Sequence, residues 1–110
     1  MMKFKKLSSD FYKIKIDDDF HDEMKRLFGF PDFYGKNFNA FIDCLSSLRF
    51  PEDGMTNIHL DKDEYLLMEI KGIHSLSDEI RHGFLLSIEV INQGAISFGD
   101  EALIFLLLIK

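Results

Sequence analysis

The most informative stretch of the sequence covers residues 32–45 and reads DFYGKNFNAFIDCL. Gly35 lets the backbone turn tightly, and Asn37 can cap a helix that begins directly after it. At about 100° per residue, one broad apolar face follows, made of Phe38, Phe41, Ile42, Leu45 and Leu48. The polar side of the segment carries Lys36, Asn39, Asp43 and Ser47. Spacing alone favours an ordinary amphipathic helix with a solvated outer face over a binding surface.

A strand and a helix are predicted before this segment. The alternation FYKIKI over residues 11–16 is typical of a half-buried strand. Three aspartates follow it, and they precede an apolar stripe at helical spacing. We therefore expect a helix that begins near Asp17 and ends near Gly29.

After the informative segment, the pattern predicts two more strands and a long helix between them. Residues 65–70 (YLLMEI) are predicted as a buried strand. Ser75 or Ser77 can cap the long helix, and Gly94 is its expected stop. Residues 103–109 form a nearly unbroken apolar run, which predicts the last strand.

This order of elements predicts an α/β fold with a small, mostly parallel three-stranded sheet and about three to four helices, in one domain over residues 1–110. Parallel strands need crossover connections, and the helical segments supply them. The apolar run of the last strand indicates burial on both faces, so we expect that strand to be central. The first strand alternates with Lys13 and Lys15 and is expected at an edge.

Composition narrows the classes of partner. The formal net charge of −6 over 110 residues disfavours direct binding to nucleic acid or to an anionic membrane surface. Any large partner is therefore expected to be basic. A single cysteine cannot close an internal disulfide, and no apolar leader segment follows the basic amino end, so a cytoplasmic location is expected. No apolar run approaches the roughly 20 residues of a membrane-spanning helix.

The sequence lacks the motifs of common enzyme classes. There is no glycine-rich phosphate loop and no run of metal-ligating residues, so we expect no cofactor, no metal and no enzymatic activity. The four histidines are scattered and are interpreted as surface or capping residues. Cys44 borders an apolar stripe and is interpreted as a small buried thiol. An acid–base enzyme would instead need Asp43 or Glu89 in a pocket with a histidine within hydrogen-bond reach.

The informative segment resembles the barstar family of ribonuclease inhibitors, whose mark is an aromatic pair, a glycine, an asparagine and then a helix. The matching positions are Phe33, Tyr34, Gly35, Asn37, Phe38, Asn39, Ala40, Phe41 and Asp43. In that family the loop and the second helix plug the active site of a secreted, basic ribonuclease, and helix acids take the place of substrate phosphate. The resemblance implies a barstar-like fold and a protein partner, either a basic ribonuclease or a related toxin-like enzyme.

The resemblance also implies a set of partner-binding residues. Asp43 would be the principal phosphate mimic, and Phe33 would be an aromatic flank. Glu89, five residues before Gly94, would supply a second acid from the long helix. The other interface positions implied in this way are Gly35, Asn37, Asn39 and Ile42.

The sequence also departs from the family pattern. Asn39 stands in place of the first helix acid, Ile42 in place of an interface aromatic residue, and Lys36 in place of the acid after the glycine. The acidic segment 51–64 is longer than usual and is interpreted as a solvated loop, with an extra contact as the alternative. These departures leave a second function open: a barstar-fold interaction, immunity or regulatory module with a partner that is not a ribonuclease. With either function, we expect the free chain to be monomeric.

Overall fold

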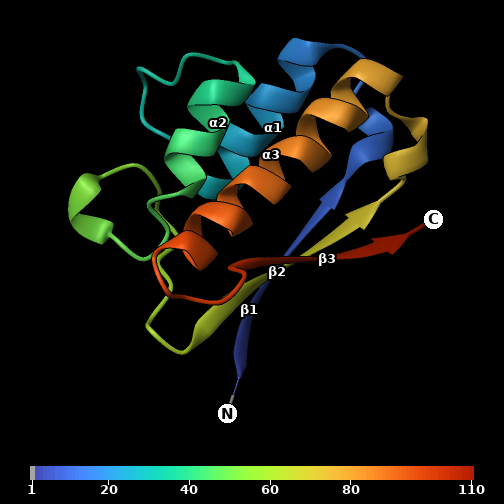
Figure 1. Ribbon diagram of the computed structural model, residues 1–110. Coiled ribbons are helices and arrows are strands. Elements are labelled where there is room, and N and C mark those ends of the chain that lie inside the picture. Colours follow the sequence, from blue (N-terminus) through green and yellow to red (C-terminus); the bar gives the residue numbers. More distant parts are fainter. Residues whose placement is uncertain (1) are drawn as a thin grey trace.

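The computed structural model describes residues 2–110 and confirms an α/β fold, with a three-stranded parallel sheet and three α-helices in that part of the chain (Figure 1). The helices are α1 (Asp17–Phe28), α2 (Phe38–Leu45) and α3 (Asp78–Ser97). The strands are β1 (Lys3–Asp10), β2 (Glu64–Lys71) and β3 (Ile104–Ile109). Short 3-10 helices form at η1 (Phe11–Lys13), η2 (Pro51–Asp53) and η3 (Ile73–Ser75).

The sheet has the order β1-β2-β3, so β2 is the central strand, and the prediction that the last strand is central is wrong. The α-helices lie together on one side of the sheet (Figure 1). Leu66, Met68 and Ile70 of β2 are fully buried in the core. In β3, by contrast, Leu107 is 44% exposed and Leu108 is 50% exposed. An apolar run therefore did not mean burial on both faces, because β3 is an edge strand and helices cover only one face.

The first strand lies at Lys3–Asp10, so the prediction of a strand over residues 11–16 is also wrong. Phe11 and Ile14 are both buried, and their spacing of three matches the 3-10 turn that follows β1. The true strand is mostly exposed and rich in lysine and serine, so it lacks the apolar alternation of a half-buried strand. The edge position was expected for residues 11–16, which form no strand, whereas β1 itself lies at an edge of the sheet.

The helix boundaries follow local capping chemistry, with one exception. The Asn37 side chain accepts a hydrogen bond from the Ala40 backbone N–H at 2.8 Å, and Ser77 caps α3 in the same way. Gly29 ends α1 in the left-handed conformation, as expected. The predicted stop at Gly94 is wrong: α3 continues to Ser97, and the glycine with a positive φ just beyond this helix is Gly99, at 89°.

Aromatic side chains form the centre of the core, between α1, α2 and α3. Phe20 lies within about 6 Å, centroid to centroid, of the rings of Phe11, Phe38, Phe41 and Phe84. Pairs in such tilted and edge-on arrangements contribute beyond their buried area. The buried side of α2, the helix of the informative segment, is therefore packed rigidly against this aromatic core.

Candidate partner-binding site

The turn before α2 is held in place by its own polar groups. Asn37, besides capping α2, donates a hydrogen bond from Nδ2 to the Gly35 carbonyl at 3.3 Å. Lys36 has a positive φ of 52°, and its ammonium lies 3.0 Å from Asp22 and 3.9 Å from Asp18 on α1. The hydrogen bond to Asp22 raises the pKa of Lys36. Lys36 therefore links the turn to α1 and does not lie on the polar face of α2.

A buried histidine provides a second link between α1 and this turn. His21 is fully buried, and its Nδ1 lies 2.6 Å from the Tyr34 hydroxyl. Burial lowers the pKa of His21 and raises that of Tyr34, so both groups are neutral near pH 7. The Nε2 atom is 3.6 Å from Asp17, too far for a hydrogen bond. The interpretation of all four histidines as surface or capping residues is thus wrong for His21.

The polar residues of α2 face solvent. Asn39 and Asp43 are exposed and lie one helical turn apart on the same face, and Ile42 is partly buried beside them. Asp43 has no hydrogen-bond or ion-pair partner among residues 2–110. Phe33, at the start of the turn, is 76% exposed. The structure therefore brings most of the predicted binding residues to one surface, and their role in binding stays a prediction.

Glu89 lies on α3 and not on the turn–helix segment itself. The family resemblance implies it as a second acid, five residues before Gly94. Glu89 is exposed and lies roughly 120° around α3 from Gly83, the residue on which Phe38 of α2 packs. Its place in an interface stays a prediction as well.

Cys44 lies on the opposite side of α2 from solvent. Its side chain is buried, as predicted, and burial raises the pKa of the thiol to about 11. A thiol with such a pKa is almost entirely protonated near pH 7, and the thiolate is the nucleophilic form. Cys44 is therefore a packing residue.

The roles of Tyr34 and Lys36 in fixing the turn do not follow from the sequence pattern. The pattern identifies Tyr34 only as half of the aromatic pair and assigns Lys36 to the polar side of the segment. The one available clue was the acidic pair Asp18 and Asp22, which share a face of α1 at a spacing of four and together attract Lys36. The contact between His21 and Tyr34 joins α1 to the turn before α2, so helical periodicity could not reveal it.

Residues 2–110 contain neither a cluster of metal-ligating side chains nor a membrane-spanning helix. No group of three or more His, Cys, Asp or Glu side chains there is arranged to hold a metal ion. None of the described helices combines the length and apolar character needed to cross a bilayer.

The fold and the exposed, locally fixed turn–helix surface are typical of a small protein-binding domain. The family model described as Barstar (barnase inhibitor) matches residues 4–108, nearly the whole chain. The chain therefore belongs to the Barstar family. A search of curated proteins produced no match.

Proposed function

We propose that this chain is a protein inhibitor that binds a basic ribonuclease, covers its active site and catalyses nothing itself. Membership of the Barstar family supports an inhibitor, and the net charge of −6 suits a basic partner. The proposed place of action is the cytoplasm, where a chain with one buried thiol needs no disulfide.

The observation that carries this proposal is the unpaired carboxylate of Asp43 on the rigid helix α2. A carboxylate in this position can accept charge-assisted hydrogen bonds from Arg, Lys or protonated His, the groups that bind phosphate in a ribonuclease. Asp43 gives up no internal ion pair when it binds, because it has none among the described residues. Asn39 and Ile42 would contact the enzyme beside it.

The fixed turn before α2 lowers the cost of such binding. Lys36 and Tyr34 hold the turn against α1 before any partner arrives. Segments ordered in advance lose less conformational entropy on association than flexible ones. Gly35 and Phe33 would then meet the partner in the conformation they already have.

The test is a titration of the purified chain into a panel of secreted bacterial ribonucleases, including a barnase-like enzyme. We expect stoichiometric inhibition of at least one member. Asp43→Asn should weaken that inhibition by about 100-fold or more, because it leaves a cationic group of the enzyme buried without its counter-charge. Glu79→Gln removes the same charge from an exposed position in the first turn of α3 and is the matched control.

Two outcomes would contradict the proposal. One is a folded chain that inhibits no ribonuclease in the panel; the other is inhibition that Asp43→Asn and Glu79→Gln reduce equally. Glu89→Gln, run in the same assay, decides whether the acid on α3 takes part.

A second candidate function is an interaction module for a partner that is not a ribonuclease. It is favoured by the pairing of Lys36 with α1, because this residue stands where the family pattern has an acid and its charge is used internally. Capture of a non-ribonuclease partner that depends on Asp43, together with no inhibition of the panel, would support this candidate.

A further inference from the structure

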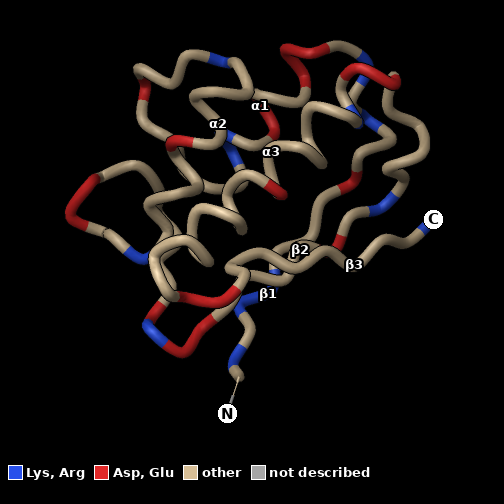
Figure 2. The backbone as a smooth tube through the Cα atoms, in the orientation of Figure 1, with Lys and Arg blue, Asp and Glu red and all other residues tan. Residues whose placement is uncertain are grey.

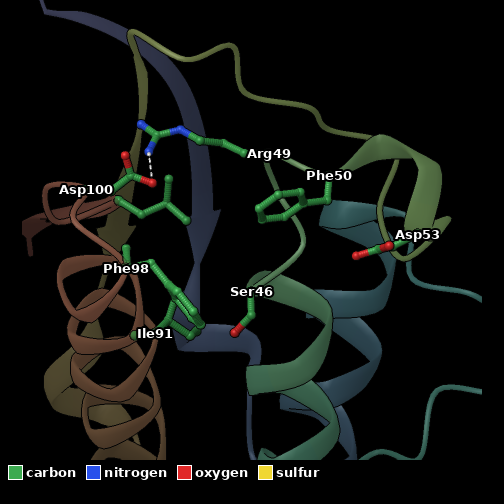
Figure 3. Close-up of a pocket in the computed structure, with 10 residues that line it drawn as sticks. Ser46, Arg49, Phe50, Asp53, Ile91, Phe98 and Asp100 are labelled. Atoms are coloured by element: carbon green, nitrogen blue, oxygen red, sulfur yellow. Dashed lines mark ion pairs between the residues drawn. The ribbon is translucent and has the colours of Figure 1, made fainter.

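The packing of α2 against α3 leaves a cavity at the carboxyl-terminal ends of the two helices. Its volume is about 420 Å³, within the range of ligand-binding pockets. The close-up shows the lining side chains from both helices turned toward one another across the open space (Figure 3). Its apolar part and rim are formed by Ser46, Phe50, Ile91, Gly94, Phe98 and Leu103.

The cavity exists because α3 has small residues where it passes the end of α2. Gly94 and Ala95 line the space, and a Cβ atom added at Gly94 would meet nothing within 4 Å. At the other end of the same helix pair, a Cβ added at Gly83 would overlap the ring of Phe38. Gly94 therefore leaves empty volume beside it, whereas the space beside Gly83 is occupied by the ring of Phe38.

Two aromatic side chains stand exposed at the rim of the cavity. Phe98 is 91% exposed and Phe50 is 53% exposed. Isolated exposed apolar residues are ordinary, but two aromatic rings beside an apolar cavity form the kind of patch that marks an interaction site. Aromatic residues around a pocket are also frequent anchors in protein interfaces.

The mouth of the cavity is acidic. Asp53 of η2 and Asp100 of the turn between α3 and β3 line the cavity, and their sequence neighbours Glu52 and Glu101 add two further carboxylates; all four are exposed. Figure 2 shows these two acidic stretches on either side of this end of the helix pair. Carboxylates on opposite sides of a low-dielectric cavity attract cations and disfavour anions.

The basic side chain at the cavity, Arg49, is held internally. Its Nη2 donates to the Glu64 carbonyl at 2.6 Å, its Nη1 lies 3.8 Å from Asp100, and its guanidinium lies 5.2 Å from the Tyr65 ring centroid. Its Nε is buried and has no hydrogen-bond partner among residues 2–110.

We propose that this cavity is a docking site for a basic protein segment, which inserts one apolar side chain between Phe50 and Phe98. The lysine or arginine neighbours of that side chain pair with the acids on both sides of the mouth. Charge complementarity selects this occupant: the chain is itself acidic, so a second copy would bring like charges together. The site is separate from the exposed face of α2, and this proposal does not depend on ribonuclease inhibition.

The first experiment measures peptide binding to the full chain by methyl NMR at Ile91 and Leu103. The probe is an acetylated pentapeptide amide with phenylalanine between two pairs of lysines. We expect saturable shifts at both methyl groups. The same peptide with glycine in place of phenylalanine, or with glutamates in place of the lysines, should bind at least about 10-fold more weakly.

Two outcomes of this peptide experiment would overturn the proposal. One is equal binding of the three peptides, and the other is the absence of shifts at millimolar lysine peptide. Shifts that grow with protein concentration and without peptide would indicate a second copy of the chain as the occupant, which would also overturn it.

Variants then locate the site. Gly94→Leu fills the cavity and should abolish the shifts, while the fold, checked by circular dichroism, is unchanged. Phe98→Ser changes a side chain that is already exposed, so the variant should fold normally. Its affinity for the lysine peptide should fall by about 3-fold or more. Unchanged peptide binding in both variants would place the peptide elsewhere and overturn the proposal.

The contribution of the acidic mouth is tested by Glu52→Gln with Glu79→Gln as the control of equal charge. Glu52→Gln should lower the affinity for the lysine peptide about 2-fold or more at low salt. The difference in affinity between the variant and the parent chain should shrink at high salt. An equal effect of the two substitutions would mean that only net charge matters, and it would contradict a localised contact.

Discussion

The two ends of the α2–α3 pair differ although each has a glycine on α3. At one end the ring of Phe38 packs on Gly83, and at the other Gly94 faces the cavity beside Phe50 and Phe98. Glycine permits a close approach only if a large side chain is present to make it. The closed end supports the turn–helix surface around Asp43, whereas the open end has empty volume for a partner to fill.

The largest expected effect comes from leucine at the two glycine positions. Gly83→Leu would force the new side chain into the ring of Phe38 and should lower the free energy of unfolding by about 3 kcal/mol. Gly94→Leu should change it by less than about 1 kcal/mol, because the cavity accepts the side chain and leucine is the better helix former. Urea denaturation of both variants measures the difference. Equal destabilisation would remove the distinction between the ends.

Glu23 of α1 is a buried, paired carboxylate that lies outside both ends of the α2–α3 pair, so its effect on stability can be compared with theirs. Its buried carboxylate accepts hydrogen bonds from Arg26 at 2.9 Å and from Ser9 at 2.6 Å, and it lies 3.1 Å from the Lys13 ammonium. Burial alone would raise the pKa of Glu23, but these three partners outweigh burial and lower it to about 2. Glu23→Gln should reduce the free energy of unfolding near pH 7 by about 2 kcal/mol.

The pH dependence of the same variant is a further check. Since the folded-state pKa of Glu23 is lower than the unfolded-state value, its contribution is complete above pH 4.5 and is lost as the pH falls toward 2. Unfolding curves of Glu23→Gln should therefore lack part of this acid-induced loss of stability. The same acid dependence in the variant and the parent chain would show that the carboxylate is not stabilised as described.

His21 makes the closed end sensitive to pH in a different range. Its ring lies 5.1 Å, centroid to centroid, from Phe38, so it belongs to the packing at this end. Burial lowers the pKa of His21 below 6.5, the value expected in the unfolded chain. Its contribution to stability is therefore complete above pH 6.5 and falls as the pH drops through the folded-state pKa.

Glutamine cannot gain a proton, so this loss of stability should disappear in His21→Gln. The substitution should also lower the free energy of unfolding near pH 7 by about 1–2 kcal/mol. Thermal unfolding of both chains between pH 7 and 5 measures the pH dependence of stability. If the parent chain becomes more stable as the pH falls through this range, the assignment of a buried neutral imidazole is wrong.

The smallest expected effect is that of alanine at the same two glycine positions. Gly94→Ala should raise the free energy of unfolding by about 0.5–1 kcal/mol, because alanine restricts the unfolded chain and meets no neighbour in α3. Gly83→Ala should lower it, because the added methyl overlaps Phe38. Denaturation midpoints of the two variants should shift in opposite directions, and a shift in the same direction would contradict the geometry.

Local chemistry made much of the fold predictable. Asn37, Ser77 and Gly29 act through groups within a few residues, so their roles as helix ends could be recognised from the sequence. The buried strand over residues 65–70 was found because it is central and all of its residues except Glu69 are apolar. Family resemblance then pointed to α2 and Asp43 as the surface to examine.

The errors all concern positions at which a distant part of the chain decides the outcome. β1 is held mainly by its pairing with β2, so its own side chains show little periodicity. Gly94 stays within α3, which continues to Ser97 before Gly99 adopts a positive φ. His21 is buried because Tyr34 and Phe38 close over it from beyond the end of its helix.

The sequence by itself determined the α/β class, the helix ends at Asn37, Ser77 and Gly29, the acidic charge and the turn–helix motif with Asp43, because these depend on neighbours along the chain. Only the tertiary structure decided that β2 is central, that Lys36 and Tyr34 fix the turn against α1, and that the two glycines of α3 have opposite surroundings. The physical reason is that burial and close packing depend on which side chains arrive from distant elements, and periodicity within one element does not specify them.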